Sequence, residues 1–199
     1  MPVTYKAGDI FLVSGQGFFS KGIRYFTRDR KEAETRATHV GVVVTDGAPE
    51  MAMVVEALGH GVVQRRFIEG PGREAHAVYR PLNLSPGAIA VATALALRNV
   101  NRGYGWLKIG AQVADWLIPF RPGGHTVYLF RRAAGLARFP FCSYLADEVI
   151  AKALEFDLAA NGIMAAVKPF GVERNCCSPD DIDDFVNLHP NLYETVKPW

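Results

Sequence analysis

The chain has 199 residues, of which 49% are hydrophobic, and its 22 basic and 20 acidic side chains give a formal net charge of +2. This composition excludes a disordered chain, and the near balance of charge argues against a nucleic-acid-binding protein, in which basic residues dominate. The length fits one domain over residues 1–199, and no apolar run reaches the ~18–20 residues that a transmembrane helix needs.

The N-terminal residues 1–13, MPVTYKAGDIFLV, contain no apolar segment typical of a signal peptide. We therefore expect a cytoplasmic protein. The alternative setting is a virion-associated protein, or one that a phage delivers to the cell wall without secretion, with phage or virion assembly partners. Three cysteines, Cys142, Cys176 and Cys177, do not make a disulfide framework, which favours a reducing compartment.

The first eighty residues predict mainly β-structure. Strands are expected at residues 9–13, 38–45, 51–58, 62–67 and 75–81, and turn residues separate them. The β-branched run at 38–45 is typical of a central strand that is buried on both faces. Because the connections between the later strands are short, antiparallel pairing is the simplest arrangement.

Helical patterns dominate the second half of the chain. Ser85 followed by Pro86 predicts the start of a helix over 87–100, and a second helix is expected over 105–118. Ser178, Pro179 and two acidic residues predict a later helix start. A short helix capped by Ser20 is expected between the first two strands. The resulting fold class is α+β, an antiparallel sheet packed against helices.

Cys142 lies at the expected N-terminus of another amphipathic helix, in the stretch FPFCSYLADEVIAKALEF. Apolar residues follow it at helical spacing, which gives the helix one buried face, and Pro140 is typical of a helix entry. The positive end of the helix dipole and the free N–H groups of a first turn favour a thiolate. The competing interpretation is a buried structural cysteine, since free cysteines are often core residues.

A cysteine nucleophile needs a base and a group that orients the base. His39 begins the valine-rich strand, where a polar ring is costly unless it is hydrogen-bonded, and Glu56 lies inside the next strand, MVVEAL. If the two strands pair through the intervening turn, His39 and Glu56 can be neighbours on one face. The competing interpretation is a buried ion pair or an edge-strand carboxylate.

The other histidines and the arginines are expected to be less informative. His60 lies in a glycine-flanked turn, and surface positions are predicted for His76, His125 and His189. Surface positions are also predicted for the cations Arg65, Arg66, Arg121, Arg131, Arg132 and Arg138. If several of these cations converged on a cleft, they would suit an acidic substrate such as a cell-wall peptide or a phospholipid head group.

No cofactor is predicted from the residue pattern. A metal site built from His39, Glu56, His60 and Cys142 is conceivable from residue types alone, but the closely spaced ligand pairs of known metal motifs are missing. The sequence pattern thus favours a nucleophilic cysteine over a metal centre.

The order of His39 in THVGVVV, Glu56 in VVEAL and Cys142 in FCSYLADEVI resembles the circularly permuted papain-like hydrolases of the NlpC superfamily, especially the YiiX-like branch. The segments AGDIFLV, SKGIRYFTRD, GHGVVQRRF and SPDDI add to the similarity, which runs from about residue 8 to residue 182. In the unpermuted relatives the cysteine helix precedes the sheet. The segment from 101 to 139 departs from the family pattern and precedes the cysteine, where insertions can shape a cleft.

The resemblance implies a permuted papain-like fold with Cys142 as nucleophile, His39 as base and Glu56 as the third member of the triad. It implies a cysteine peptidase or amidase, and we expect cleavage of amide bonds in peptidoglycan peptides through an acyl-enzyme. One alternative is a lipid acyl hydrolase or acyltransferase with the same triad, in which the apolar residues 105–120 would line an acyl-chain groove. The other is a non-enzymatic structural or assembly module that kept the fold.

Overall fold

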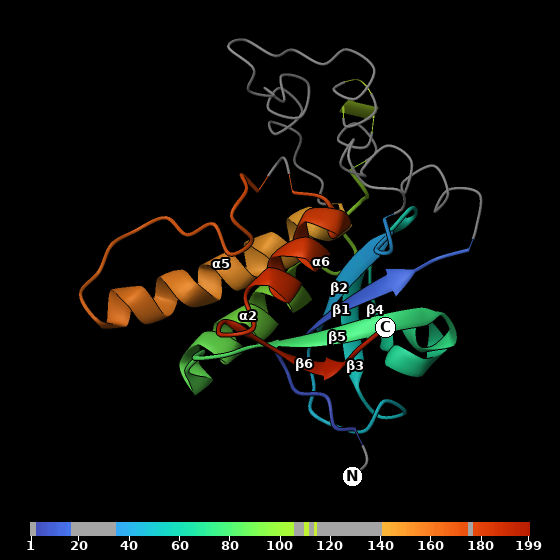
Figure 1. Cartoon of the computed structure of the whole chain (residues 1–199), viewed down its shortest axis with the longest axis horizontal. Coiled ribbons are helices and arrows are strands. Elements are labelled where there is room, and N and C mark those ends of the chain that lie inside the picture. Colours follow the sequence, from blue (N-terminus) through green and yellow to red (C-terminus); the bar gives the residue numbers. More distant parts are fainter. Residues whose placement is uncertain (1–2, 17–34, 106–109, 112–113, 115–140, 175–176) are drawn as a thin grey trace.

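The computed structural model describes residues 3–16, 35–105, 110–111, 114, 141–174 and 177–199. These residues form an α+β fold in which a six-stranded antiparallel sheet packs against helices (Figure 1). The strands are β1 (Ile10–Ser14), β2 (His39–Val43), β3 (Met53–Leu58), β4 (Gly61–Arg66), β5 (Ala75–Pro81) and β6 (Tyr193–Lys197). They lie in the order β4-β3-β2-β1-β5-β6. The helices are α2 (Pro86–Arg98), α5 (Cys142–Ala160) and α6 (Pro179–Leu188), with short 3-10 helices η1 (Phe67–Glu69) and η2 (Pro71–Arg73).

Five of these strands lie within two residues of their predicted bounds, and the predicted antiparallel pairing is confirmed. The valine-rich strand β2 lies inside the sheet between β1 and β3, as its composition indicates. The sixth strand, β6, was not predicted. It pairs with β5 at one edge of the sheet, where the half-polar sequence YETVK has little hydrophobic signal of its own.

The two faces of the sheet are covered differently. Helices α2, α5 and α6 lie against one face and bury a large core that includes Val40, Val42 and Leu145 (Figure 1). A smaller core on the other face includes Phe11, and Phe67 of η1 packs against it. Alternation along each strand sends neighbouring side chains to opposite faces. His39, Gly41 and Glu56 therefore share the face of the smaller core.

The helix starts follow their capping residues. The Ser85 hydroxyl accepts a hydrogen bond from the Ala88 N–H at 3.1 Å, with Pro86 at the first helical position of α2. Ser178 and Asp181 form a reciprocal capping box at the start of α6. Such caps each contribute about 1 kcal/mol to helix stability. These two predicted starts are confirmed, whereas the Ser20 helix and Pro140 lie outside the described residues.

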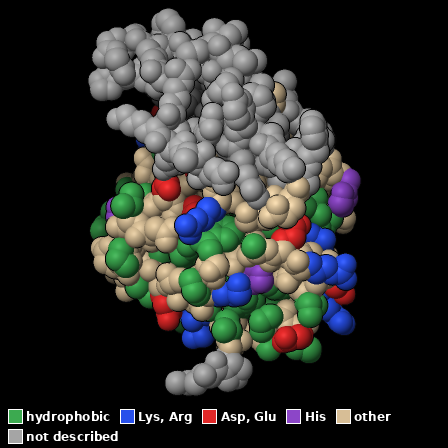
Figure 2. All heavy atoms as spheres, turned by 45° about the vertical axis from the view of Figure 1, so that its right-hand side comes forward, with side chains coloured by type: hydrophobic (Ala, Val, Ile, Leu, Met, Phe, Trp, Pro, Cys, Tyr) green, Lys and Arg blue, Asp and Glu red, His purple; other side chains and the backbone are tan. Residues whose placement is uncertain are grey.

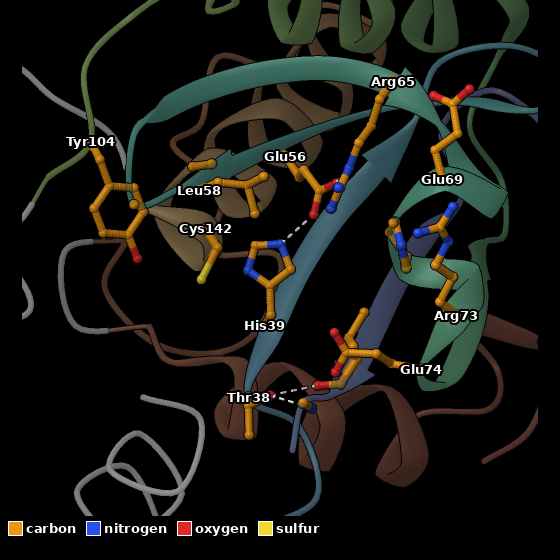
Figure 3. A pocket seen from close by; sticks show the side chains of 16 residues that line it. Thr38, His39, Glu56, Leu58, Arg65, Glu69, Arg73, Glu74, Tyr104 and Cys142 are labelled. Carbon is orange, nitrogen blue, oxygen red and sulfur yellow. Dashed lines mark hydrogen bonds and ion pairs between the residues drawn. The ribbon is translucent and has the colours of Figure 1, made fainter. Parts of the chain in front are cut away.

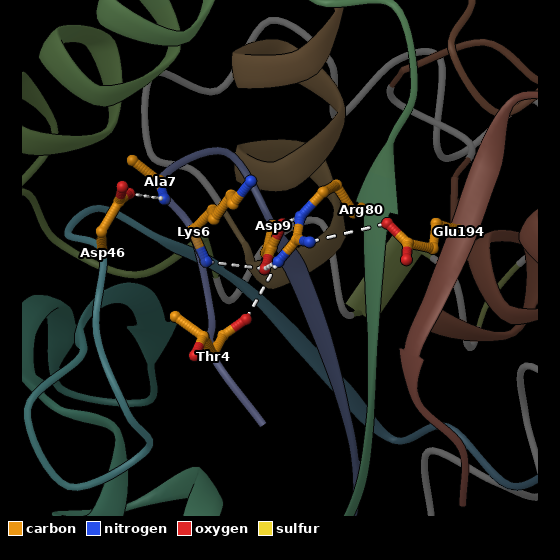
Figure 4. Close-up of polar contacts among 7 residues, drawn as sticks. All are labelled: Thr4, Lys6, Ala7, Asp9, Asp46, Arg80 and Glu194. Atoms are coloured by element: carbon orange, nitrogen blue, oxygen red, sulfur yellow. Dashed lines mark hydrogen bonds and ion pairs between the residues drawn. The ribbon is translucent and has the colours of Figure 1, made fainter. Parts of the chain in front are cut away.

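A bidentate ion pair ties the N-terminal segment to strand β5 (Figure 4). Arg80 on β5 donates from Nε and Nη2 to the two carboxylate oxygens of the fully buried Asp9, both at 2.8 Å. The Arg80 guanidinium also lies 3.5 Å from Glu194 on β6. Two-pronged guanidinium–carboxylate contacts fix orientation as well as distance. Arg80 thereby joins three segments that are distant in the sequence.

The face shown in Figure 2 carries basic and acidic side chains interspersed among hydrophobic ones, in keeping with the small net charge. In the part of the chain that the structure describes, no helix combines the length and the apolar character needed to cross a membrane. Of the predicted helix over 105–118, only residues 105, 110, 111 and 114 are described, and the last three are helical.

Candidate active site

One pocket brings together the three residues that the sequence singled out. His39, Glu56 and Cys142 line it, and its volume is about 510 Å³ (Figure 3). His39 is the first residue of β2, Glu56 lies within β3 and Cys142 is the first residue of α5. The expected proximity of His39 and Glu56 is confirmed, and the thiol comes to them from a helix 86 residues further along the chain than Glu56.

The imidazole and the carboxylate are held by strand register. Gly41 of β2 faces Glu56 of β3, so His39 lies one diagonal step from Glu56 on the same face of the sheet. His39 Nε2 lies 2.7 Å from Glu56 Oε2, a hydrogen-bonding distance. The other ring nitrogen, Nδ1, points toward Cys142 (Figure 3). The ring therefore bridges the carboxylate and the thiol.

The Cys142 side chain is 3% exposed but borders the pocket, because helix α5 begins at this residue. The preceding residue, Phe141, makes no side-chain capping bond to the first turn. The next residue, Ser143, donates its hydroxyl to the carbonyl of Cys177 at 2.7 Å and so anchors the helix start to the segment before α6. The thiol thus lies on a fixed helix terminus.

A fourth residue contacts the site from the next strand. Arg65 of β4 donates from Nε to Glu56 Oε1 at 2.5 Å, while His39 occupies the other oxygen. The sequence predicted a solvated surface position for Arg65, and this prediction is wrong. The guanidinium lines the pocket because the β3–β4 hairpin sends Glu56 and Arg65 to the same face.

The charges of the site stabilise one another. Burial opposes the charged form of His39, but hydrogen bonds and charges from Cys142 and Glu56 outweigh it and raise the pKa of His39 to about 10. Burial also opposes ionisation of Glu56, yet His39 and Arg65 together lower the pKa of this carboxyl below its usual value. The arrangement therefore favours an imidazolium beside a carboxylate.

The pocket also contains residues that the sequence does not predict as site residues. Tyr104, which follows α2, places its phenol on the Cys142 side of the pocket, and burial raises the pKa of Tyr104, so the phenol stays protonated. Arg73, Glu69 and Glu74 of the η1–η2 region form the opposite side. Their isolated positions in the sequence carry no signal that could have assigned them to a site.

The remaining histidines lie away from this cluster. His60 is exposed in its turn, and His189 is half-buried at the end of α6. His76, predicted at the surface, is buried instead: its ring packs on Phe67 at 4.9 Å between centroids and lies 3.4 Å from the Tyr5 hydroxyl. His125 lies outside the described residues, as do Cys176, Arg121, Arg131, Arg132 and Arg138.

Among the described residues, no group of three or more His, Cys, Asp or Glu side chains has an arrangement that could hold a metal ion. No protein-family model matches the chain, and no curated protein matches it.

Proposed function

We propose that the protein is a cysteine hydrolase of the permuted papain-like type, with Cys142 as nucleophile, His39 as base and Glu56 as the residue that orients the base. The observation that carries this proposal is the meeting of these three side chains in one pocket, from β2, β3 and the first turn of α5. A nucleophile beside a base that a third group holds is the arrangement that acyl transfer requires.

The reaction would proceed in two halves. The Cys142 thiolate attacks the carbonyl carbon of the substrate, and the His39 imidazolium gives its proton to the leaving amine as the carbon–nitrogen bond breaks. A water molecule then loses a proton to His39 and attacks the thioester, and breakage of the carbon–sulfur bond releases the acid and restores the thiolate–imidazolium pair. Glu56 holds the imidazole through Nε2 during both halves, so that Nδ1 faces the sulfur.

The oxyanion formed in each half needs hydrogen-bond donors. The backbone N–H of Cys142 lies at the start of a helix, where first-turn N–H groups have no partner within the helix. The protonated phenol of Tyr104 beside the thiol is a candidate second donor. Both groups would be in place before the substrate binds.

Amide bonds in cell-wall peptides are the proposed substrates. The support is the family resemblance, together with the charges of both signs that Arg73, Glu69 and Glu74 bring to the same pocket. Peptides of this class carry amine and carboxyl groups, which side chains of opposite charge can pair.

The first test is the alkylation rate of each cysteine by iodoacetamide near pH 6, read by peptide mass spectrometry in the wild type and in His39→Ala. An ordinary thiol, with a pKa of about 8.5, is almost entirely protonated at this pH and reacts slowly. We expect fast labelling of Cys142 that depends on His39, with the buried Cys177 as an internal control. Uniformly slow labelling of the folded protein would contradict the proposal.

A substrate screen then follows, with muropeptides first and fatty-acyl esters second. Release of a new amine from a muropeptide by the wild type, but not by Cys142→Ala, would support amide cleavage. Turnover of acyl esters alone would indicate that the same triad belongs to a lipid acyl hydrolase or acyltransferase. Absence of turnover on both, together with slow labelling, would favour a structural module.

A further inference from the structure

We infer that Arg65 is a positioning residue of this site, which holds one oxygen of Glu56 so that the other oxygen is presented to His39. This role in catalysis rests on the proposed function, in which Cys142, His39 and Glu56 form the triad. It extends the triad to a chain of four side chains, Arg65, Glu56, His39 and Cys142, in which each contacts the next.

The strand register builds this chain. His39, Glu56 and Arg65 lie on three adjacent strands, β2, β3 and β4, and each step between them is diagonal across the ladder. Glu56 faces Gly41 of β2, which is two residues from His39. On the other side Glu56 faces Val63 of β4, which is two residues from Arg65. Because side chains two residues apart share a face, all three polar groups point the same way.

The Glu56 carboxylate depends on both neighbours. Its side chain is 1% exposed, Oε1 accepts from Arg65 Nε at 2.5 Å, and Oε2 lies 2.7 Å from His39 Nε2. A buried carboxylate oxygen that loses its donor carries the full cost of desolvation. Without Arg65, Glu56 would therefore rotate or take up a proton, and either change weakens its hold on His39.

A second feature of the fold makes room for the guanidinium beside Glu56. Gly70, at the junction of η1 and η2, packs directly under it: a Cβ at this position would lie 2.0 Å from Arg65 Cζ and 2.4 Å from Nε. The absence of a side chain at Gly70 leaves the space that the guanidinium fills. This contact is independent of the ion pair, so replacing Gly70 can displace Arg65 without removing any charge.

The charged and titratable groups around Glu56 influence the pH at which its carboxylate gains a proton. Among the described residues, His39 and Arg65 are hydrogen-bonded to the Glu56 carboxylate. The same pocket is also lined by Glu69, Arg73, Glu74, Tyr104 and Cys142. A guanidinium keeps its charge at all accessible pH values. Removing the Arg65 guanidinium should therefore raise the pH at which Glu56 gains a proton.

The experiment compares the wild type with Arg65→Gln, Arg65→Lys and Gly70→Ala. Arg66→Gln is the matched control, because Arg66 is the next residue, is 62% exposed and reaches Glu69 rather than Glu56. The Glu56 carboxyl carbon is followed by ¹³C NMR from pH 3 to 8, and the Cys142 alkylation rate is measured over the same range. Circular dichroism monitors folding.

We expect the Glu56 midpoint and the acid limb of the alkylation profile to move upward by about one pH unit or more in Arg65→Gln. Gly70→Ala should move both in the same direction, Arg65→Lys should move both less, and Arg66→Gln should move neither. Unchanged midpoints in folded Arg65→Gln or Gly70→Ala would overturn the inference. If Arg65→Gln does not fold, Gly70→Ala and Arg65→Lys decide.

The two proposals fail in distinguishable ways. Slow, His39-independent alkylation of the wild type would contradict the hydrolase, whatever the carboxyl titration shows. A Glu56 midpoint that is insensitive to Arg65 would contradict the positioning role even if Cys142 reacts rapidly.

Discussion

His39 and Glu56 hold each other across two neighbouring strands, one diagonal step apart in the β2–β3 ladder, with 2.7 Å between Nε2 and Oε2. Both residues belong to strands in the interior of the sheet and not to a loop, so the backbone ladder fixes where their side chains begin. A slip of one residue in register would turn one partner to the opposite face. The orientation of the imidazole toward Cys142 is therefore a direct consequence of strand pairing.

Replacing the sulfur should abolish the proposed hydrolase activity without unfolding the protein. We expect Cys142→Ala to lower kcat/KM by a factor on the order of 10³ or more, because no other described thiol borders the pocket. The change removes one small buried group, so the cost in stability should be about 1 kcal/mol. Turnover assays and thermal unfolding check both expectations. A variant with full activity would eliminate Cys142 as the nucleophile.

Replacements of the other two members of the proposed triad should differ in severity. His39→Ala removes the proposed base and should be almost as damaging as loss of the thiol. Glu56→Gln keeps a carbonyl oxygen that can accept from His39, so we expect a milder loss of about 10- to 100-fold. Values of kcat/KM for the two variants, with circular dichroism to confirm folding, test this order. The reverse order would contradict the assigned roles.

Gly41 should be intolerant of any side chain. A Cβ there would lie 2.3 Å from Phe11 Cζ and 2.9 Å from the Val55 carbonyl oxygen, and Phe11 is fully buried. Overpacking of this kind costs about 1–3 kcal/mol or more, so Gly41→Ala should lower the free energy of unfolding by at least that amount. Urea unfolding measures it.

Gly87→Ala is the matched control for Gly41. Its Cβ would meet Phe156 Cε1 at 2.8 Å, but Phe156 is 45% exposed and can move aside, and alanine favours the helix. We expect little change in its free energy of unfolding. Equal losses in the two variants would show that the close approach of Phe11 is not the cause.

Asp147 should make stability depend on pH. It is buried on α5, its Oδ1 accepts from Arg174 Nε at 3.0 Å, and its Oδ2 has no hydrogen-bond partner among the described residues. Burial raises the pKa of Asp147 from 3.8 to about 6, despite the bond to Arg174. The folded state therefore binds a proton more readily than the unfolded state, and the associated stability is present below about pH 4 and lost as pH rises through about 6.

Asp147→Asn removes this titration. A rise in the pKa of Asp147 from 3.8 to about 6 corresponds to roughly 3 kcal/mol, so the stability of the variant relative to the wild type should increase by up to that amount between pH 4 and 7. Urea unfolding at four pH values tests it, with the exposed Glu50→Gln as control. A difference between Asp147→Asn and wild type that does not vary with pH would contradict the expectation.

Much of the fold was predictable because the signals are local. β-Branched runs, glycine turns and the Ser85 and Ser178 caps act through neighbouring residues, so five strands and three helix starts could be placed from the sequence. The proximity of His39 and Glu56 also follows from a local cause, since the connection over residues 44–52 joins strands that are consecutive in the chain. β6 could not be placed, because its weak pattern gains its partner only from the edge of the assembled sheet.

By itself the sequence determined the α+β class and the start of a helix at Cys142, and it indicated that His39 and Glu56 would be neighbours if their two strands paired. Only the tertiary structure decided that the helix terminus reaches these strands, that Arg65 contacts Glu56, and that His76 is buried. The physical reason is the sequence separation of the interacting residues, because hydrophobic periodicity and capping depend on residues that are close together in the chain. The packing of α5 against the sheet, and of Gly70 under Arg65, depends on contacts that exist only after the layers have assembled.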